Sequence, residues 1–145
     1  MTTTEIGIVS TPAQIITFRG MLASSSIEYK VCFVLTQLGF KSNLSGFRYI
    51  MSAVKKVMSD KTYMSGITKR LYVDIAKDFK SSPSRVERAI RNCISSSNYV
   101  EPEICEMYLG NRNIVPGTLT NSELIGILVM LMEFNEYANN NGMEN

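Results

Sequence analysis

The stretch from Lys80 to Cys93 reads KSSPSRVERAIRNC, and it decides the expected fold of the chain. At the 3.6-residue period of an α-helix, the apolar positions fall on one side: Val86, Ala89, Ile90 and Cys93. The polar positions fall on the opposite side: Arg85, Glu87, Arg88, Arg91, Asn92 and Ser95. The pattern predicts an amphipathic helix with one face in the core. Ser84, with Glu87 three residues later, is expected to cap its start as a capping box.

The residues before this helix predict a second helix, joined to it by a short turn. The segment DIAKDFK (74–80) has a helical pattern, and Ala76 is small enough to let the two helices cross closely. Lys80 falls where such turns need a positive φ, a position usually occupied by glycine. The sequence therefore predicts a helix-turn-helix at about residues 67–97.

Apolar spacing along the rest of the chain predicts further helices and no convincing strand after residue 25. The expected helices cover about residues 27–38, 45–60, 67–79, 84–97, 101–109 and 122–137. We therefore predict an all-α fold, a six-helix domain over residues 27–138. Residues 1–26 are expected to form an N-terminal arm or a small hairpin, and residues 139–145 a disordered tail.

The composition argues against several classes of function. The chain has no histidine, which removes histidine-based nucleophile pairs and histidine metal ligands. Its three cysteines are widely spaced, which favours a reducing compartment over a disulfide framework or a zinc site. It has no phosphate-binding glycine loop, no secretory signal and no apolar run of about 20 residues. We expect a cytoplasmic protein that is not an enzyme, holds no metal or other cofactor and does not bind membranes.

The net charge of +2 is unevenly distributed along the chain. Residues 41–91 contain twelve lysines and arginines against four acidic residues, and the remainder contains three against nine. The block at 41–91 therefore carries +8 and the rest of the chain −6. Such a block attracts phosphate backbones and releases counterions on binding. Lysines and arginines that only keep helix surfaces soluble would give the same block. The order of the residues within the block therefore has to distinguish solubility from nucleic-acid binding.

The polar face of the helix at 84–97 carries side chains that can read base edges. Arginine donates two hydrogen bonds to guanine, glutamate accepts one from cytosine, and asparagine pairs with adenine. Arginine also fits a planar pair of acceptors better than lysine does. We therefore predict double-stranded DNA as the partner. From charge and position, we expect phosphate contacts at Lys69, Lys80, Arg91 and Asn92.

The same residues resemble a known family. GITKRLYVDIAKDFKSSPSRVERAIRNCI (66–94) closely resembles the helix-turn-helix in the C-terminal DNA-binding domain of the master response regulator of sporulation in endospore-forming bacteria. LTNSELIGILVMLMEF (119–134) resembles that domain's last helix, and residues 35–60 resemble its first two helices more loosely. The resemblance implies a six-helix domain that binds boxes with a T-G-n-C-G-A-A core. It also implies that Arg85, Glu87 and Arg88 read bases from the major groove.

The resemblance further implies binding as a homodimer or as tandem copies on DNA. The expected contacts between copies come from the last helix: Leu124, Leu128, Leu131 and Phe134. The family regulator also carries a phosphoacceptor receiver domain. The 26 residues before the first helix, with Glu5 as their only acid, are expected not to supply one. Residues 92–115 differ from the family pattern, so partner contacts there are not expected to carry over.

Two functions remain after these observations. The first is a sequence-specific DNA-binding transcription regulator, nucleoid-associated when bound. The alternative is a protein-interaction module that pairs with another regulator, such as a full-length relative, and modulates it. The intact SRVER segment (84–88) favours the first, because a pure decoy would not need it.

Overall fold

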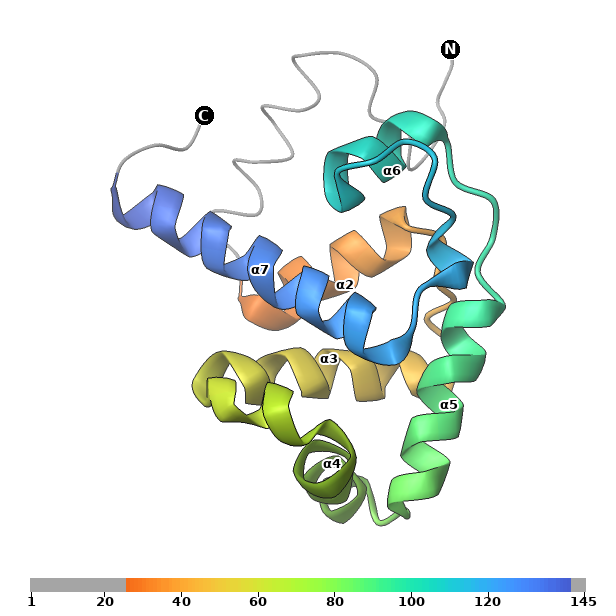
Figure 1. Cartoon of the computed structure of the whole chain (residues 1–145), viewed down its shortest axis with the longest axis vertical. Helices are drawn as coiled ribbons and strands as arrows, with labels where there is room; N and C mark the ends of the chain where they lie inside the picture. Colours follow the sequence, from red (N-terminus) through yellow and green to blue (C-terminus); the bar gives the residue numbers. More distant parts are fainter. Residues whose placement is uncertain (1–25, 142–145) are drawn as a thin grey trace.

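Six α-helices make up most of the part of the chain that the structure, a computed structural model, describes, namely residues 26–141 (Figure 1). They are α2 (Ile27–Gln37), α3 (Ser45–Ser59), α4 (Tyr72–Phe79), α5 (Pro83–Ser95), α6 (Pro102–Leu109) and α7 (Asn121–Asn140). Within these residues no strand is present. The predicted all-α, six-helix class is therefore confirmed. The arm or hairpin expected at residues 1–26 lies outside the described residues, except for Ser26.

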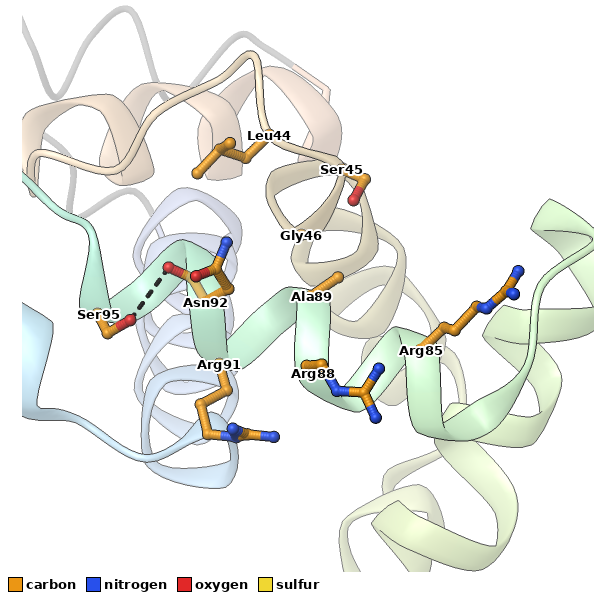
Figure 2. Close-up of a pocket in the computed structure, with 9 residues that line it drawn as sticks. All are labelled: Leu44, Ser45, Gly46, Arg85, Arg88, Ala89, Arg91, Asn92 and Ser95. Carbon is orange, nitrogen blue, oxygen red and sulfur yellow. Dashed lines mark hydrogen bonds between the residues drawn. The ribbon is translucent and has the colours of Figure 1, made fainter.

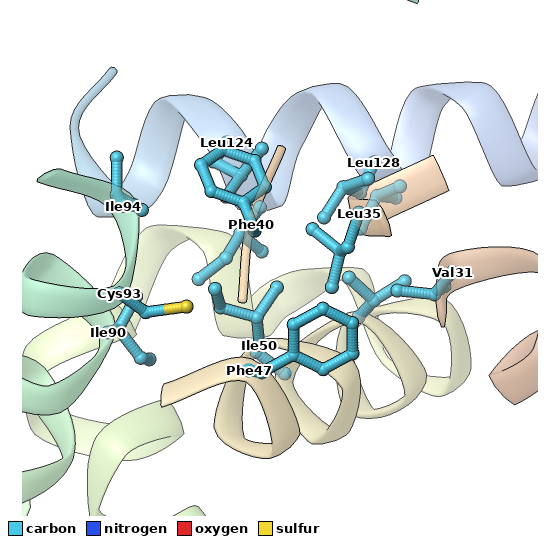
Figure 3. Close-up of a cluster of buried hydrophobic side chains, with 14 of the residues drawn as sticks. Val31, Leu35, Phe40, Phe47, Ile50, Ile90, Cys93, Ile94, Leu124 and Leu128 are labelled. Atoms are coloured by element: carbon cyan, nitrogen blue, oxygen red, sulfur yellow. The ribbon is translucent and has the colours of Figure 1, made fainter. Parts of the chain in front are cut away.

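The core forms around α3, which contacts α2, α4, α5 and α7. Figure 3 shows side chains from α2, α3, α5 and α7, together with Phe40 from the loop after α2, meeting in one apolar cluster. The labelled members are Val31, Leu35, Phe40, Phe47, Ile50, Ile90, Cys93, Ile94, Leu124 and Leu128. All ten are almost completely buried, which is the main source of stability for a chain of this size. Phe79, the last residue of α4, lies at the edge of this core: it is 38% exposed and packs edge-on against Tyr49.

The close packing of α3 on α5 depends on Gly46. A Cβ atom at this position would lie 2.1 Å from the carbonyl oxygen of Ala89 and 2.8 Å from Cβ of Cys93. Only glycine fits without moving a helix backbone, since real Cβ atoms essentially never approach so closely. Gly46 therefore sets the distance at which the predicted recognition helix sits on the core.

The segment before α4 differs from the continuous helix predicted at 67–79. It contains a 3₁₀ helix, η1 (Lys61–Gly66), and then a π-helical turn, η2 (Ile67–Leu71), in which Tyr72 N donates to Ile67 O. Arg70 fixes this segment: its Nη1 donates to Thr62 Oγ1 at 2.7 Å, and its guanidinium stacks 4.3 Å from the centre of the Tyr63 ring. These side-chain contacts anchor a helical turn of a kind that is rare in proteins.

The helix ends follow the expected chemistry with one correction. Ser26 caps α2 by accepting from Tyr29 N, and Gly39 follows its end with φ 85°. The prediction that Ser84 caps α5 is wrong. Ser82 is the cap, accepting from Arg85 N at 3.3 Å, and Pro83 is the first helical residue. Proline favours that position because its φ is fixed near the helical value and it has no N–H to satisfy.

The last helix is longer than predicted. The disordered tail was expected to begin at residue 139, but α7 continues through Asn140. Ala138 is still buried at 8% exposure, so the helix contacts the protein almost to its end. Residues 142–145 lie outside the described part. Thr120 caps the start of α7 in a capping box with Glu123, in which each side chain accepts from the other residue's backbone N–H.

Candidate nucleic-acid interface

α4 and α5 form the predicted helix-turn-helix, joined by residues 80–82. Lys80 has φ 55° and ψ 50°, which confirms the expected left-handed residue in the turn. Ser81 N then donates to Ala76 O at 2.8 Å and closes the end of α4. Ala76 and Val86 are both buried where the two helices meet. The turn therefore fixes the direction in which α5 leaves the core.

The outer face of α5 presents two arginines without partners. Arg85 and Arg88 are exposed, and neither guanidinium makes an ion pair or hydrogen bond with any residue between 26 and 141. Figure 2 shows both side chains extending away from the helix. The opposite face is locked in the core through Val86, Ile90 and Cys93, each with 0% exposure. Both guanidinium groups are therefore free to bind a ligand with planar acceptors.

Glu87 and Arg91 on the same face bind each other. Arg91 Nε donates to Glu87 Oε2 at 3.2 Å, and Arg91 Nη2 donates to Glu87 Oε1 at 3.1 Å. Both carboxylate oxygens are therefore engaged, in a bidentate pair one helical turn apart. Glu87, expected to read a base, and Arg91, expected to bind a phosphate, thus act on one another in the free protein.

A shallow pocket of about 370 Å³ lies between the start of α3 and this face of α5 (Figure 2). The residues that line it are Leu44, Ser45, Gly46, Arg85, Arg88, Ala89, Arg91, Asn92 and Ser95. The start of α3 has no side-chain cap, and Leu44 occupies the cap position. The first N–H groups of α3 therefore add the positive end of a helix dipole to the guanidinium groups of Arg85 and Arg88, whereas the charge of Arg91 is offset by Glu87. The field at this pocket favours anions.

An asparagine of α7 connects α5 with α4. Asn121 Nδ2, at the start of α7, donates to the Tyr72 hydroxyl of α4 at 3.0 Å and to the Glu87 carbonyl oxygen of α5 at 3.1 Å. Burial is the main cause that raises the pKa of Tyr72 above its ordinary value, so its phenol stays neutral at physiological pH. The sequence pattern does not predict this bridge, because no local signal links residues that are 34 and 49 positions apart.

The remaining residues expected to bind phosphate are all exposed. Asn92 lies on the outer face of α5, Lys80 in the turn, and Lys69 in the π turn before α4. Neither lysine forms an ion pair with a residue of the described range. Arg70, the neighbour of Lys69, is instead occupied by Asp60, Thr62 and Tyr63.

The four residues expected to contact a second copy lie in different environments. Leu124 and Leu128 have 0% exposure and pack in the protein's own core, so they are not available to a partner. Leu131 is partly buried against the core, and Phe134 is 65% exposed. Met130 and Tyr137, at helical spacing around Phe134, are also more than half exposed. Leu124 and Leu128 were misplaced because α7 is apolar on most sides, and periodicity alone cannot tell its core face from an outer one.

Two further properties bear on the class of protein. No helix among residues 26–141 is long and apolar enough to cross a membrane. The same residues contain no group of three histidine, cysteine, aspartate or glutamate side chains that could hold a metal ion. The fold and its exposed basic face define a helix-turn-helix DNA-binding domain.

The comparison with protein families identifies which one. The family described as "Sporulation initiation factor Spo0A C terminal" matches residues 31–132. The match covers most of the chain, and the chain belongs to this family. The resemblance found in residues 35–60, 66–94 and 119–134 is thereby confirmed. The family is the DNA-binding effector domain of a sporulation regulator and is not a family of enzymes.

Proposed function

We propose that this chain is a sequence-specific transcription regulator that acts in the cytoplasm, at the nucleoid. It reads T-G-n-C-G-A-A-like boxes with α5 in the major groove, using Arg85, Glu87 and Arg88. One observation carries the proposal: Arg85 and Arg88 project from the outer face of the second helix of a helix-turn-helix with no partner among the described residues. Each guanidinium group has a rigid, planar set of N–H donors, which suits the paired acceptors of guanine.

The residues around α5 support contacts with the phosphate backbone of DNA on either side of the major groove. Lys69 and Lys80, which have no ion-pair partner among residues 26–141, lie near the two ends of α4. The uncapped start of α3 offers backbone N–H groups beside α5, a common means of binding a phosphate. Phosphate contacts of this kind orient a reading helix without selecting a sequence.

A second candidate function is a protein-interaction module that pairs with another regulator. The exposed apolar side chains of α7, Met130, Phe134 and Tyr137, favour it, because such residues gathered on one helix face mark contact surfaces. The same face fits a homodimer or tandem copies on DNA, with Leu131 and Phe134 as contacts. The two functions predict different behaviour towards DNA.

Selection of bound duplexes from a random pool separates them. We expect enrichment of T-G-n-C-G-A-A-like boxes, with pairs at a fixed spacing where copies bind in tandem. Specific binding should then exceed binding to a scrambled duplex by about 10³-fold or more at near-physiological salt. Equal affinity for the selected box and the scrambled duplex would show that the chain does not recognise a sequence. The protein-interaction module would then be the remaining candidate function.

The Lys69→Ala variant tests the proposed contact of Lys69 with the phosphate backbone of DNA. Lys69 is exposed and lies outside α5, so its loss should weaken binding to all duplexes alike. The slope of log K against log salt concentration should become shallower by about 0.9, the amount for one phosphate contact. Arg112→Ala is the control: it removes the same charge from the loop after α6, where Arg112 pairs with Glu106. An unchanged slope for Lys69→Ala would contradict this role.

A further inference from the structure

The ion pair on the reading face suggests a role for Arg91 that differs from phosphate binding. We infer that Arg91 is a positioning residue that determines specificity: it holds the Glu87 carboxylate in the orientation in which Glu87 selects one base pair. The inference rests on the proposed function, because it assumes that α5 reads DNA.

The geometry of the pair supports positioning. Arg91 engages both oxygens of Glu87 through two different nitrogens, which fixes the plane of the carboxylate as well as its position. The glutamate precedes the arginine by four residues, the favoured order on a helix. The backbone of Glu87 is also held, because its carbonyl oxygen accepts from Asn121. Glu87 is therefore fixed at both its main chain and its side chain before any ligand arrives.

The paired carboxylate can still accept a hydrogen bond. An ionised carboxylate has about four acceptor sites, and Arg91 occupies two of them. The remaining sites can accept from the exocyclic amino group of cytosine, which is exposed in the major groove. A side chain that is already ordered loses little entropy on binding, so the contact keeps more of its free energy. Arg91 also reduces the repulsion between this carboxylate and nearby phosphates.

Phosphate binding by Arg91 alone does not account for the pair. The pair uses two of the five N–H donors of Arg91, and breaking it would free a negatively charged side chain on a face that approaches a polyanion. The arrangement therefore favours a pair that stays together on DNA.

The two roles are distinguished by replacing Arg91 in the whole chain. Affinities are measured for a panel of duplexes, each with one base pair of the selected box changed, over a series of salt concentrations. Arg91→Lys keeps the charge but has a single nitrogen, so it cannot fix the plane of the carboxylate through two nitrogens as Arg91 does. We expect its preference to relax by about tenfold at a single base pair, the one at which Glu87→Ala also loses preference. The salt slope of Arg91→Lys should match that of the wild type. Because Arg91 is exposed, the midpoint of thermal unfolding of the Arg91→Lys variant should stay close to the wild-type value.

A double variant provides the second measurement. If Arg91 acts through Glu87, then Glu87→Ala with Arg91→Ala should have no less preference at that base pair than Glu87→Ala alone. The inference is overturned if Arg91→Lys keeps the full wild-type preference, or if Arg91→Ala weakens all duplexes equally with a shallower slope. Relaxation at a different base pair would overturn it too, since Arg91 would then read that base itself. If the wild-type chain showed no base preference, the proposed function itself would be wrong. That result differs from the outcomes above, which concern only the role of Arg91.

Discussion

The Arg85→Ala/Arg88→Ala double variant should lose about 2–6 kcal/mol of specific binding free energy, because each bidentate contact to guanine contributes about 1–3 kcal/mol. Both side chains are exposed and bind nothing else among the described residues, so no contact within the protein is lost with them. The free energy of unfolding should therefore change by less than about 0.5 kcal/mol for each substitution. Fluorescence anisotropy with the selected box and with a scrambled duplex measures both affinity and preference.

The matched control variant keeps the positive charge of both side chains but removes their planar pairs of N–H donors. Arg85→Lys/Arg88→Lys should retain most of the binding to scrambled DNA and the wild-type salt slope, because the phosphate field is unchanged. It should nevertheless lose much of its preference for the box, since lysine cannot reproduce two parallel hydrogen bonds in a plane. Wild-type selectivity in the alanine double variant would show that another surface reads the sequence.

Gly46→Ala should have the largest effect on stability. The new Cβ would lie 2.1 Å from a backbone oxygen of α5, and a backbone atom cannot rotate away as a side chain can. Either α3 or α5 has to shift, and we expect a loss of about 3 kcal/mol or more in the free energy of unfolding. Urea denaturation followed by circular dichroism measures this loss. The affinity for DNA should fall as well, because α5 would sit differently on the core.

Gly126→Ala separates this steric effect from the general effect of replacing a glycine. Gly126 lies inside α7, and a Cβ there would meet only the flexible end of Met64, at 3.7 Å. Alanine should therefore stabilise the helix by about 0.5–1 kcal/mol. If both variants behaved alike, the close approach of α3 and α5 at Gly46 would be wrong.

The parts of the fold that the sequence could predict depend on local patterns. The two faces of α5 follow from residue spacing, and the buried set of Val86, Ile90 and Cys93 agrees with it. Lys80 could be assigned to the left-handed turn because helix-turn-helix units need a positive φ at a fixed place. Ser26 and Gly39 carry ordinary signals for the two ends of a helix.

The parts that could not be predicted depend on contacts between distant residues or on two local signals that compete. Both Ser82 and Ser84 can cap α5, and the fixed φ of Pro83 favours Ser82. The π turn at Ile67–Leu71 is held by Arg70 through residues of η1 and its cap, which a helical period does not reveal. The Arg91 pair matches a common solvent-exposed motif, so spacing alone could not distinguish it from a free cation.

The backbone of Lys80 has a consequence for how the domain approaches a duplex. A side chain in the left-handed region costs about 1–2 kcal/mol compared with glycine, which would make the same turn without strain. The chain thus carries a strained backbone at a corner from which an exposed lysine side chain leaves, just before α5 begins. In a regulator of the proposed kind, this turn gives up some folding stability and gains a positive charge that glycine could not supply.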